Sequence, residues 1–343
     1  MPRSTTGGEG SEFHISTGAE VTCTGLLRNQ DGALLANLHE IHVHSQGALV
    51  NEEGGRIENE DEITNAGLGS SFTNRSAATI TNTGIILNVA GCASTNQSGA
   101  ELVNAGSPGL QNSGGAIGPV PVPAQWINEN ATIRNSGPTT FVNDSMAILV
   151  NRGTEARIFF VAGASPVNGT GAQCYNSDNA RLVVDFLSSI QNSAIVANEA
   201  RIENGGTFEN SGTVTLAVGS SVTSGGIYRQ TSGMTTVEGL LDQRNVEFTG
   251  GTLTGGGTVR STTAPLAVSP GVFVAPGGSI GTLTVDGDLS FSGSTLEIEI
   301  GPDGCDQLRG LGAAEFEGGT VSLSFSKGFV PDVGSTFPVI DAT

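Results

Sequence analysis

The chain has 343 residues, including 51 glycines, and its 33 Asp and Glu against 14 Lys and Arg give a formal net charge of −19. Such acidity argues against a nucleic-acid-binding protein or a protein of anionic membrane surfaces, because both need clustered basic residues. Aromatic residues make up only 5% of the chain. So few large side chains suit a narrow core, which favours an elongated repeat fold.

The chain opens with MPRSTTGGEGSEFHI, which has no apolar run typical of a signal peptide. No later segment approaches the roughly 20 uninterrupted apolar residues of a membrane helix. We therefore expect no membrane insertion by this segment. Residues 1–20 are predicted to form an N-terminal cap or arm, in which polar Met1–Glu12 covers the end of the fold.

From about Leu27 to Asn210 a short unit of alternating apolar and polar residues recurs and usually ends in Asn. Every third unit repeats after 22 to 24 residues, as from Asn29 to Asn51 and on to Asn74. The markers stand at positions 29, 37, 51, 59, 65, 74, 82, 88, 96, 104, 112, 128, 135, 143, 151, 168, 176, 192, 198, 204 and 210, and the frame continues where Asn is missing near His44, Val120, Phe160 and Val184.

Each unit has the period of a β-strand, and Asn with Gly is expected to turn the chain in the left-handed conformation. Three strands and three turns in 22–24 residues predict one coil of a right-handed parallel β-helix, an all-β, three-faced β-solenoid. Equivalent Asn side chains then lie one above another and form hydrogen-bonded ladders. We assign residues 21–210 to this Asn-ladder β-helix.

After Asn210 the turns change from Asn to Gly pairs, while short Val, Leu, Thr and Phe strands continue. Residues 211–343 are therefore predicted to form a Gly-rich passenger-type β-helix. The irregular stretch from Phe325 to Asp341 contains Pro331 and Pro338, which cannot donate to a ladder. We expect this stretch to fold over the last coil as a C-terminal cap, which favours a soluble monomer or a small lateral oligomer over head-to-tail filaments.

The C-terminal third carries phrases in a characteristic order: IYRQTSG from Ile227, FTGGTLTGGGTV from Phe248, VAPGGSIGTLTVDGDL from Val274, STLEIEIG from Ser294, Asp306-Gln307-Leu308 and FPVIDA from Phe337. Together they resemble the passenger-associated repeat of bacterial autotransporter and filamentous adhesin proteins. The resemblance implies a secreted or surface-exposed right-handed β-helix with an adhesive or scaffolding role and no catalytic centre. The chain departs from that family in lacking a signal peptide and in stopping at Thr343, before an outer-membrane barrel.

Three of the four histidines lie in the stretch from Leu38 to His44. On a strand, Glu40, His42 and His44 share one face, whereas His39, Ile41 and Val43 share the other. Glu40, His42 and His44 could together hold Zn²⁺ or another transition metal. A polar outer face over a buried Ile41 and Val43 is the simpler interpretation, because no fourth ligand can be named, and it is the one we adopt.

Cys23, Cys92, Cys174 and Cys305 form no CxxC pair. At this repeat length, consecutive cysteines are separated by about three or more coils, beyond the ~7 Å between Cα atoms that a disulfide allows. We expect them to be unpaired, small core residues.

Acidic residues gather in two regions, where Ca²⁺ could bind to carboxylate and carbonyl oxygens. They are Glu52-Glu53, Glu58 and Glu60-Asp61-Glu62 in the first region, and Asp286, Asp288, Asp303 and Asp306 in the second. The sequence has neither an EF-hand loop nor a GGxGxD array, so a solvated acidic surface that keeps the protein soluble is favoured, and no cofactor is assigned.

No catalytic motif occurs in the context that it requires: this holds for GxSxG, whose pattern is matched only by GGSIG at residues 277–281, and for HExxH, Walker A and GxGxxG. The sequence is therefore interpreted as a non-enzyme without catalytic residues. A sugar-binding β-helix would stack glycans on aromatic rings, for which Trp126 is the one indole. The neighbouring PVPVP run, Pro119–Pro123, is predicted to be an extended strand or turn in which Pro replaces a ladder residue.

The sequence thus predicts a non-catalytic extracellular structural or adhesive rod or filament subunit. Its expected partners are cell surfaces, polysaccharides or further copies of the chain. One alternative is a virion spike or fibre that binds or cleaves glycans, and another is a calcium- or metal-binding matrix protein. Ice binding is disfavoured because its aligned threonine rows would need threonines on one face, and here they fall on different strands.

Overall fold

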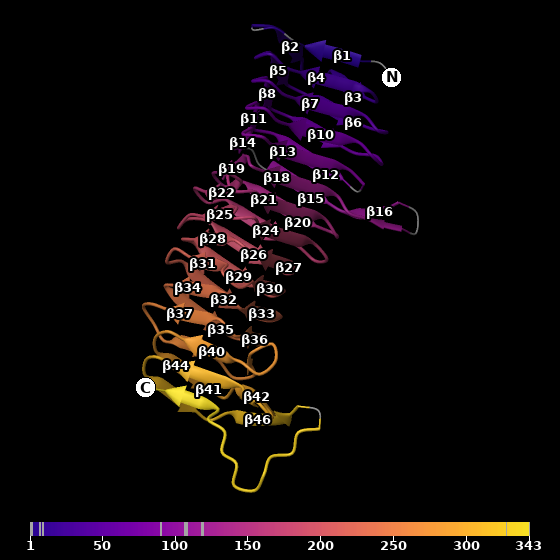
Figure 1. Cartoon of the computed structure of the whole chain (residues 1–343). Helices are drawn as coiled ribbons and strands as arrows, with labels where there is room; N and C mark the ends of the chain where they lie inside the picture. The colour runs from indigo at the N-terminus through magenta and orange to yellow at the C-terminus, as the bar shows by residue number, and fades with distance from the viewer. Residues whose placement is uncertain are drawn as a thin grey trace. The chain divides into compact units, whose positions relative to one another are not determined.

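Short strands in which buried and outward-facing side chains alternate build the fold, as the two-residue period predicts. A computed structural model describes residues 3–6, 8, 10–89, 91–105, 109–117, 120–326 and 328–342. Parallel pairing between successive coils gives three sheets, A, B and C, which form a β-solenoid of about 23 residues per coil. The predicted all-β solenoid is therefore confirmed (Figure 1). No helix in the described ranges is long and apolar enough to cross a membrane.

The chain divides into two compact units, Met1–Val196 and Ala197–Thr343, with β27 (Ile195–Asn198) at the division. In the first unit, sheet A contains β1 (Arg3–Thr6), β4 (Leu26–Asn29), β7 (Ala48–Asn51), β10 (Ser71–Asn74), β13 (Ala93–Gln97), β18 (Gln125–Glu129), β21 (Ile148–Arg152) and β24 (Gln173–Ser177). Sheet B contains β2 (Glu12–Ile15), β5 (Leu34–Asn37), β8 (Arg56–Asn59), β11 (Thr79–Asn82), β14 (Glu101–Asn104), β19 (Thr132–Ser136), β22 (Arg157–Val161) and β25 (Arg181–Val184).

Sheet C of the first unit contains β3 (Glu20–Cys23), β6 (Glu40–Val43), β9 (Glu62–Asn65), β12 (Ile85–Val89), β15 (Gly109–Ser113), β20 (Thr140–Asp144), β23 (Ser165–Asn168) and β26 (Ser189–Asn192). The segment assigned to an N-terminal cap or arm includes β1 and β2, which pair in parallel with β4 and β5. Residues 1, 2, 7 and 9 of that segment lie outside the described residues.

In the second unit, sheet A contains β30 (Thr213–Leu216), β33 (Met234–Val237), β36 (Thr252–Gly255), β39 (Phe273–Pro276), β42 (Thr295–Gly301), β43 (Gly304–Cys305) and β46 (Thr320–Phe325). Sheet B contains β28 (Arg201–Asn204), β31 (Ser221–Thr223), β34 (Leu240–Gln243), β37 (Thr258–Ser261), β40 (Thr282–Val285), β44 (Gln307–Gly310) and β47 (Ile340–Ala342). Sheet C contains β29 (Thr207–Asn210), β32 (Ile227–Gln230), β35 (Asn245–Phe248), β38 (Leu266–Val268), β41 (Leu289–Ser292) and β45 (Ala314–Glu317).

The marker asparagines form buried side-chain ladders along the coils, as predicted from their period. In sheet A of the first unit, each Nδ2 donates to the Oδ1 of the next coil, from Asn29 through Asn51, Asn74, Asn96, Asn128 and Asn151 to Asn176, at 2.8–3.0 Å. Sheet B carries a ladder from Asn37 to Asn135, and sheet C one from Asn65 to Asn192. The core of these coils in the first unit thus pairs polar groups as well as packing apolar ones.

The turns differ from the expectation. The marker asparagines are the buried residues at strand ends, and none of them has a positive φ. Left-handed conformations occur instead at glycines such as Gly54 and at short polar or small residues such as Ser45 and Ala77. An Asn that must direct its amide into the ladder belongs to the extended strand, so the residues after it turn the chain.

One coil of the first unit carries an insertion. The separation between Asn96 and Asn128 is 32 residues, whereas the preceding sheet A neighbours are 22 or 23 residues apart. The extra residues form the antiparallel hairpin of β16 (Gly115–Ile117) and β17 (Val120–Val122), which projects from the stacked coils in Figure 1. The run around Pro121 is therefore extended, as predicted, but it lies in this hairpin and replaces no residue of the coil ladder. Pro119 lies outside the described residues.

Candidate functional site

The middle of the histidine stretch forms β6, whose outward side chains belong to a row of polar residues on the outer face of sheet C. Ile41 and Val43 are fully buried, so the adopted interpretation of a polar outer face over an apolar inner face is confirmed for them. His39, which was placed with the inner residues, comes before the strand and points outward: its Nδ1 lies 3.1 Å from Asp61 Oδ2. The corner of the coil precedes β6, so strand alternation does not apply to His39.

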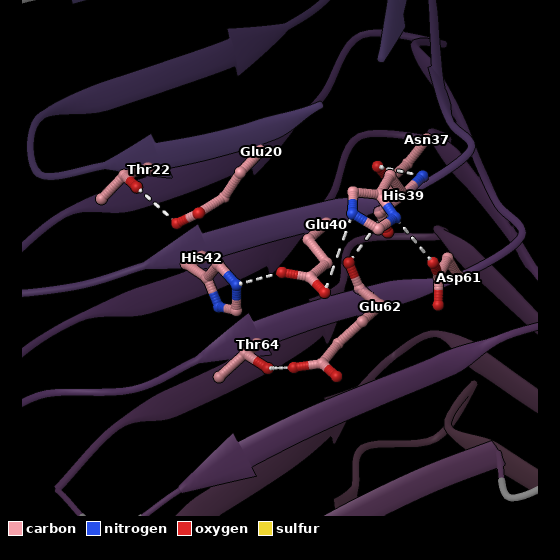
Figure 2. A network of polar contacts seen from close by, with 9 residues as sticks. All are labelled: Glu20, Thr22, Asn37, His39, Glu40, His42, Asp61, Glu62 and Thr64. Carbon is pink, nitrogen blue, oxygen red and sulfur yellow. Dashed lines mark hydrogen bonds and ion pairs between the residues drawn. The ribbon is translucent and has the colours of Figure 1, made fainter. Parts of the chain in front are cut away.

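Strand register places three glutamates one above another in this row. Glu20 on β3 is in register with Glu40 on β6, and Glu40 is in register with Glu62 on β9. Each carboxylate accepts a hydrogen bond from the residue two positions further along its own strand: Thr22 at 3.0 Å, His42 at 3.0 Å, and Thr64 (Figure 2). We call Glu20, Glu40 and Glu62 the acidic ladder.

The histidines around Glu40 lower the pKa of its carboxyl. The hydrogen bond from His42 lowers the pKa of the Glu40 carboxyl, and the Coulombic effects of His39 and His42 act in the same direction. His39 Nε2 also lies 3.9 Å from Glu40 Oε1. The row therefore keeps its central carboxylate ionised below the ordinary pKa of Glu.

The three metal candidates Glu40, His42 and His44 are not arranged as one ligand set. The His42 ring stacks on that of His44 with centroids 5.7 Å apart, and its Nε2 is bonded to Glu40. Among the described residues, no three His, Cys, Asp or Glu side chains come together so that they could hold a metal ion.

Three of the acidic residues that lie close to other acids in the sequence, Glu52, Asp286 and Asp306, are bound by arginines or by backbone amides. Glu52 is buried between arginines: its carboxylate accepts from Arg75 Nε at 2.7 Å and lies 3.1 Å from Arg28 Nε. In the second unit, Asp286 pairs with Arg260, and the pKa of that guanidinium is raised by the hydrogen bond and the Coulombic attraction. Asp306 accepts from two backbone amides, those of Gly281 and Glu299. These carboxylates therefore have internal structural partners.

Trp126, the indole considered for sugar stacking, is a core residue. Its side chain is 1% exposed and packs edge-to-face on Phe141, whose ring in turn contacts Phe160. Trp126 lies at an inward position of β18, where it fills the coil that carries the inserted hairpin, so the one indole weighed for the sugar-binding alternative offers no exposed ring.

The four cysteines form no disulfide, as predicted. Cys23, Cys92 and Cys174 are buried, and burial raises the pKa of the Cys174 thiol to about 12. Cys305 differs from the expectation of a core residue, because it is only half-buried near Pro338 O.

The last coil of the second unit exposes side chains at inward positions. In β46, Val321, Leu323 and Phe325 are in register with the buried core residues Leu296, Ile298 and Ile300 of β42. Each of the three is about half exposed. The described chain from residue 328 to β47 forms a long loop outside the coil (Figure 1). The cap predicted from Phe325 to Asp341 therefore does not cover these side chains.

Threonines are better aligned than the sequence suggested. Thr215 on β30, Thr236 on β33 and Thr254 on β36 occupy matching register positions on the outer face of sheet A. Residues on different strands share a row because each coil returns one strand to the same sheet. The expectation that threonines on different strands cannot form an aligned row is thus wrong for this part of the second unit.

Register also aligns basic side chains on sheet B of the first unit. Arg157 on β22 is in register with Arg181 on β25, and Arg134 on β19 is in register with Phe159, over whose ring its guanidinium lies at 4.7 Å. Arg134 therefore lies in a different row from Arg157 and Arg181, because Arg157 is in register with Thr132. Neither the acidic ladder nor the pair of Arg157 and Arg181 was predicted from the sequence. The Glu-x-Thr or Glu-x-His triplets at 20, 40 and 62 were the available signal for the acidic ladder.

Comparison of the chain with family models, with curated proteins and with solved structures found no match.

Proposed function

We propose that this chain is a non-catalytic structural or adhesive β-solenoid that displays regular outer faces to partners at a cell surface or outside the cell. The right-handed winding and the relation to passenger-type adhesins, inferred from the phrases between Ile227 and Ala342, belong to the same proposal. Partners of this kind of protein are cell surfaces, polysaccharides or further copies of the chain.

The sheet A ladder from Asn29 to Asn176 carries this proposal. Seven buried asparagines are joined by six consecutive side-chain hydrogen bonds, in parallel with the backbone pairing of the same strands. Opening one coil therefore breaks backbone and side-chain bonds together and leaves buried polar groups without partners, which is costly. Such a construction favours resistance to local opening, as a scaffold under load requires.

Pulling on single molecules tests the mechanical role. The whole chain is tethered at its two ends and extended, and we expect stepwise unfolding in increments of one or a few coils of about 23 residues. The ladder variant Asn82→Ala should unfold at lower force, whereas Thr81→Ala, on the outer face of the same strand, should not. Unfolding in one featureless step, at equal force in all three proteins, would contradict the role.

Adhesion and catalysis are tested on the same preparation. The tethered protein is brought against bacterial and host cell surfaces and against films of neutral and acidic polysaccharides, with the heat-unfolded protein as control. We expect binding to at least one surface by the folded protein alone. Cleavage of the polysaccharides, measured as new reducing ends, would contradict the non-catalytic assignment.

A further inference from the structure

We propose that Asn130 is an attachment site for an N-linked sugar on the folded chain. The inference goes beyond the proposed structural role and rests on it only for the location of the chain at a cell surface or outside the cell. An asparagine two residues before Ser or Thr is the acceptor sequence for this modification, provided that the residue between them is not Pro. The chain has five such acceptor sites, which begin at Asn74, Asn96, Asn130, Asn143 and Asn168.

Four of these asparagines belong to the buried ladders and are closed to modification. Asn74 and Asn96 lie in sheet A, Asn143 and Asn168 lie in sheet C, and none of the four is more than 6% exposed. The Nδ2 of each donates to the next ladder member at 2.8–3.0 Å. Transfer of a sugar to such a nitrogen requires local opening of the coil, which breaks the ladder bond.

Asn130 is the exception, because it lies outside the ladders in the short turn between β18 and β19. It is exposed and has a φ of 49°, in the left-handed region. Its backbone amide donates to the carbonyl oxygen of Arg152, and its carbonyl oxygen accepts from the amide of Gly99, so both neighbouring coils hold the turn. Its Oδ1 accepts from the amide of Glu155 at 3.4 Å, whereas its Nδ2 donates to no acceptor in the described ranges. The nitrogen that would react thus belongs to an exposed side chain on a fixed backbone.

An open depression of about 490 Å³ adjoins Asn130 and offers room for a sugar. Ser98 and Gly99 of the preceding coil line it with little bulk, and Glu155 and Arg157 of the following coil line it with charged groups. The Arg157 guanidinium lies 3.5 Å from the Glu155 carboxylate, and both side chains are well exposed. Carboxylates accept hydrogen bonds from hydroxyl groups and guanidinium groups donate to them, so this pair can bind the first sugar unit.

Thr132 completes the acceptor sequence at an outward position of β19. In the reaction, Nδ2 of Asn130 forms a bond to the anomeric carbon of a sugar diphosphate, and the bond from that carbon to the diphosphate oxygen breaks. The diphosphate leaves with the electron pair of that bond, and a proton of Nδ2 passes to a base of the transferring enzyme. A lipid or a nucleoside carries the diphosphate, and both donors give the same linkage to the protein.

Asn179 occupies the corresponding turn two coils later and provides an internal control. It lies between β24 and β25, is exposed and has a φ of 64°. Both asparagines are followed by alanine, but Arg181 stands in the position that Thr132 has after Asn130. Asn179 should therefore stay unmodified in the natural sequence, and Arg181→Thr should make it an acceptor.

The test incubates the purified full chain with a lipid-linked oligosaccharide and an oligosaccharyltransferase, and separately with a nucleotide-activated hexose and a soluble N-glycosyltransferase. Peptide mass spectrometry measures the occupancy of each site. In at least one arm we expect occupancy of Asn130 to exceed that of every ladder asparagine roughly tenfold or more, because local opening must precede reaction at a buried amide. Thr132→Ala should abolish transfer to Asn130, whereas Thr132→Ser should retain it.

Short peptides that contain each of the five sites are the reference, since no fold protects them, and a standard acceptor peptide proves that both enzymes are active. Trp126 fluorescence reports that the variants are folded. Absence of a sugar on Asn130 in the folded chain in both arms would overturn the proposal, as would equal occupancy of the ladder asparagines or a sugar on Asn130 in Thr132→Ala. Absence of a sugar on Asn179 in folded Arg181→Thr would contradict selection by the exposed turn. Single-molecule unfolding and adhesion are measured on the unmodified chain, so the proposed function fails separately.

Discussion

Asn135 is in register with Phe160 on the next coil, and this pair ends the asparagine ladder of sheet B. Asn104 donates to Asn135 at 3.0 Å, but the buried Nδ2 of Asn135 has no hydrogen-bond partner among the described residues. The ladder has a direction, since every Nδ2 donates toward the following coil. Its last member therefore lacks an acceptor. At the start of the sheet C ladder the reverse holds: Asn65 Oδ1, in register with Val43, has no donor in the described part of the chain.

The direction of the ladder predicts that replacing an asparagine by alanine costs more inside the ladder than at its last position. Asn82→Ala removes the acceptor of Asn59 and the donor to Asn104, so we expect a loss of about 1–3 kcal/mol of unfolding free energy. Asn135→Ala removes only the acceptor of Asn104, and its loss should be smaller by about 1 kcal/mol. Urea unfolding followed by Trp126 fluorescence compares the two, with Thr81→Ala as the outer-face control. Equal losses of unfolding free energy in the two variants would contradict the direction of the ladder.

Gly84 tests how closely the coils stack. A Cβ at this position would lie 1.9 Å from the carbonyl oxygen of Asp61 in the preceding coil. We expect Gly84→Ala to destabilise the fold by about 1–3 kcal/mol, because the backbone must move to accept one methyl group. Gly278→Ala is the control, since its nearest neighbour is the flexible end of Glu238 at 3.8 Å. A melting temperature equal in both variants would contradict the close contact.

Thiol burial predicts the order of chemical labelling. In the native protein Cys305 should react first with a thiol reagent at pH 8, although burial and the nearby Asp306 raise its pKa. Cys174, whose pKa is raised to about 12, should react only after unfolding in urea. Mass spectrometry of labelled peptides identifies the sites, and Cys305→Ser is the control. Rapid labelling of Cys174 in the folded chain would be inconsistent with its place in the core.

The fluorescence of Trp126, the single tryptophan, tests whether its indole is buried in the core. We expect native fluorescence at short wavelength and weak quenching by iodide, because the Trp126 indole is buried against Phe141. Unfolding should shift the emission to long wavelength and restore quenching. Soluble oligosaccharides should not change the native spectrum; a saturable change on their addition would instead support the sugar-stacking role.

The pH response of Glu40 tests the polar row. Its pKa is lowered in the folded state, so the stabilising contact is present above the unfolded pKa and is lost as pH falls through the folded pKa. Removing the donor in His42→Ala should raise the folded pKa toward the ordinary value. A carbon-13 NMR titration of the Glu40 carboxyl measures this shift. His14→Ala is the matched control, because His14 bonds a different glutamate, Glu12. An unchanged titration in His42→Ala would refute the contact.

The sequence was sufficient to predict the solenoid, its repeat and the buried ladders because Asn recurs at the coil period and carries both a donor and an acceptor. It also placed Ile41 and Val43 inside by simple alternation. Alternation failed for His39, because this residue lies at a corner before the strand begins. Turn propensity failed for the marker asparagines, which were assigned to turns although they end the strands.

Other features depend on register, which a period alone does not fix. Glu20 and Glu40 are 20 residues apart, whereas Glu40 and Glu62 are 22 apart, so only the pairing of β3, β6 and β9 shows that they form one row. The inward position of Trp126 also depends on register. The inserted hairpin before it hides the frame in which it occupies an inward position.

Hydrogen exchange of the asparagine side-chain amides tests the central claim of buried, continuous ladders most directly. By NMR of the folded protein, the Nδ2 protons of Asn51, Asn74 and Asn96 should be strongly protected, because each donates inside the core. Those of Asn130, exposed in a turn, should exchange at the rate of a free amide. Fast exchange at all four positions would contradict the ladders and the structural role built on them.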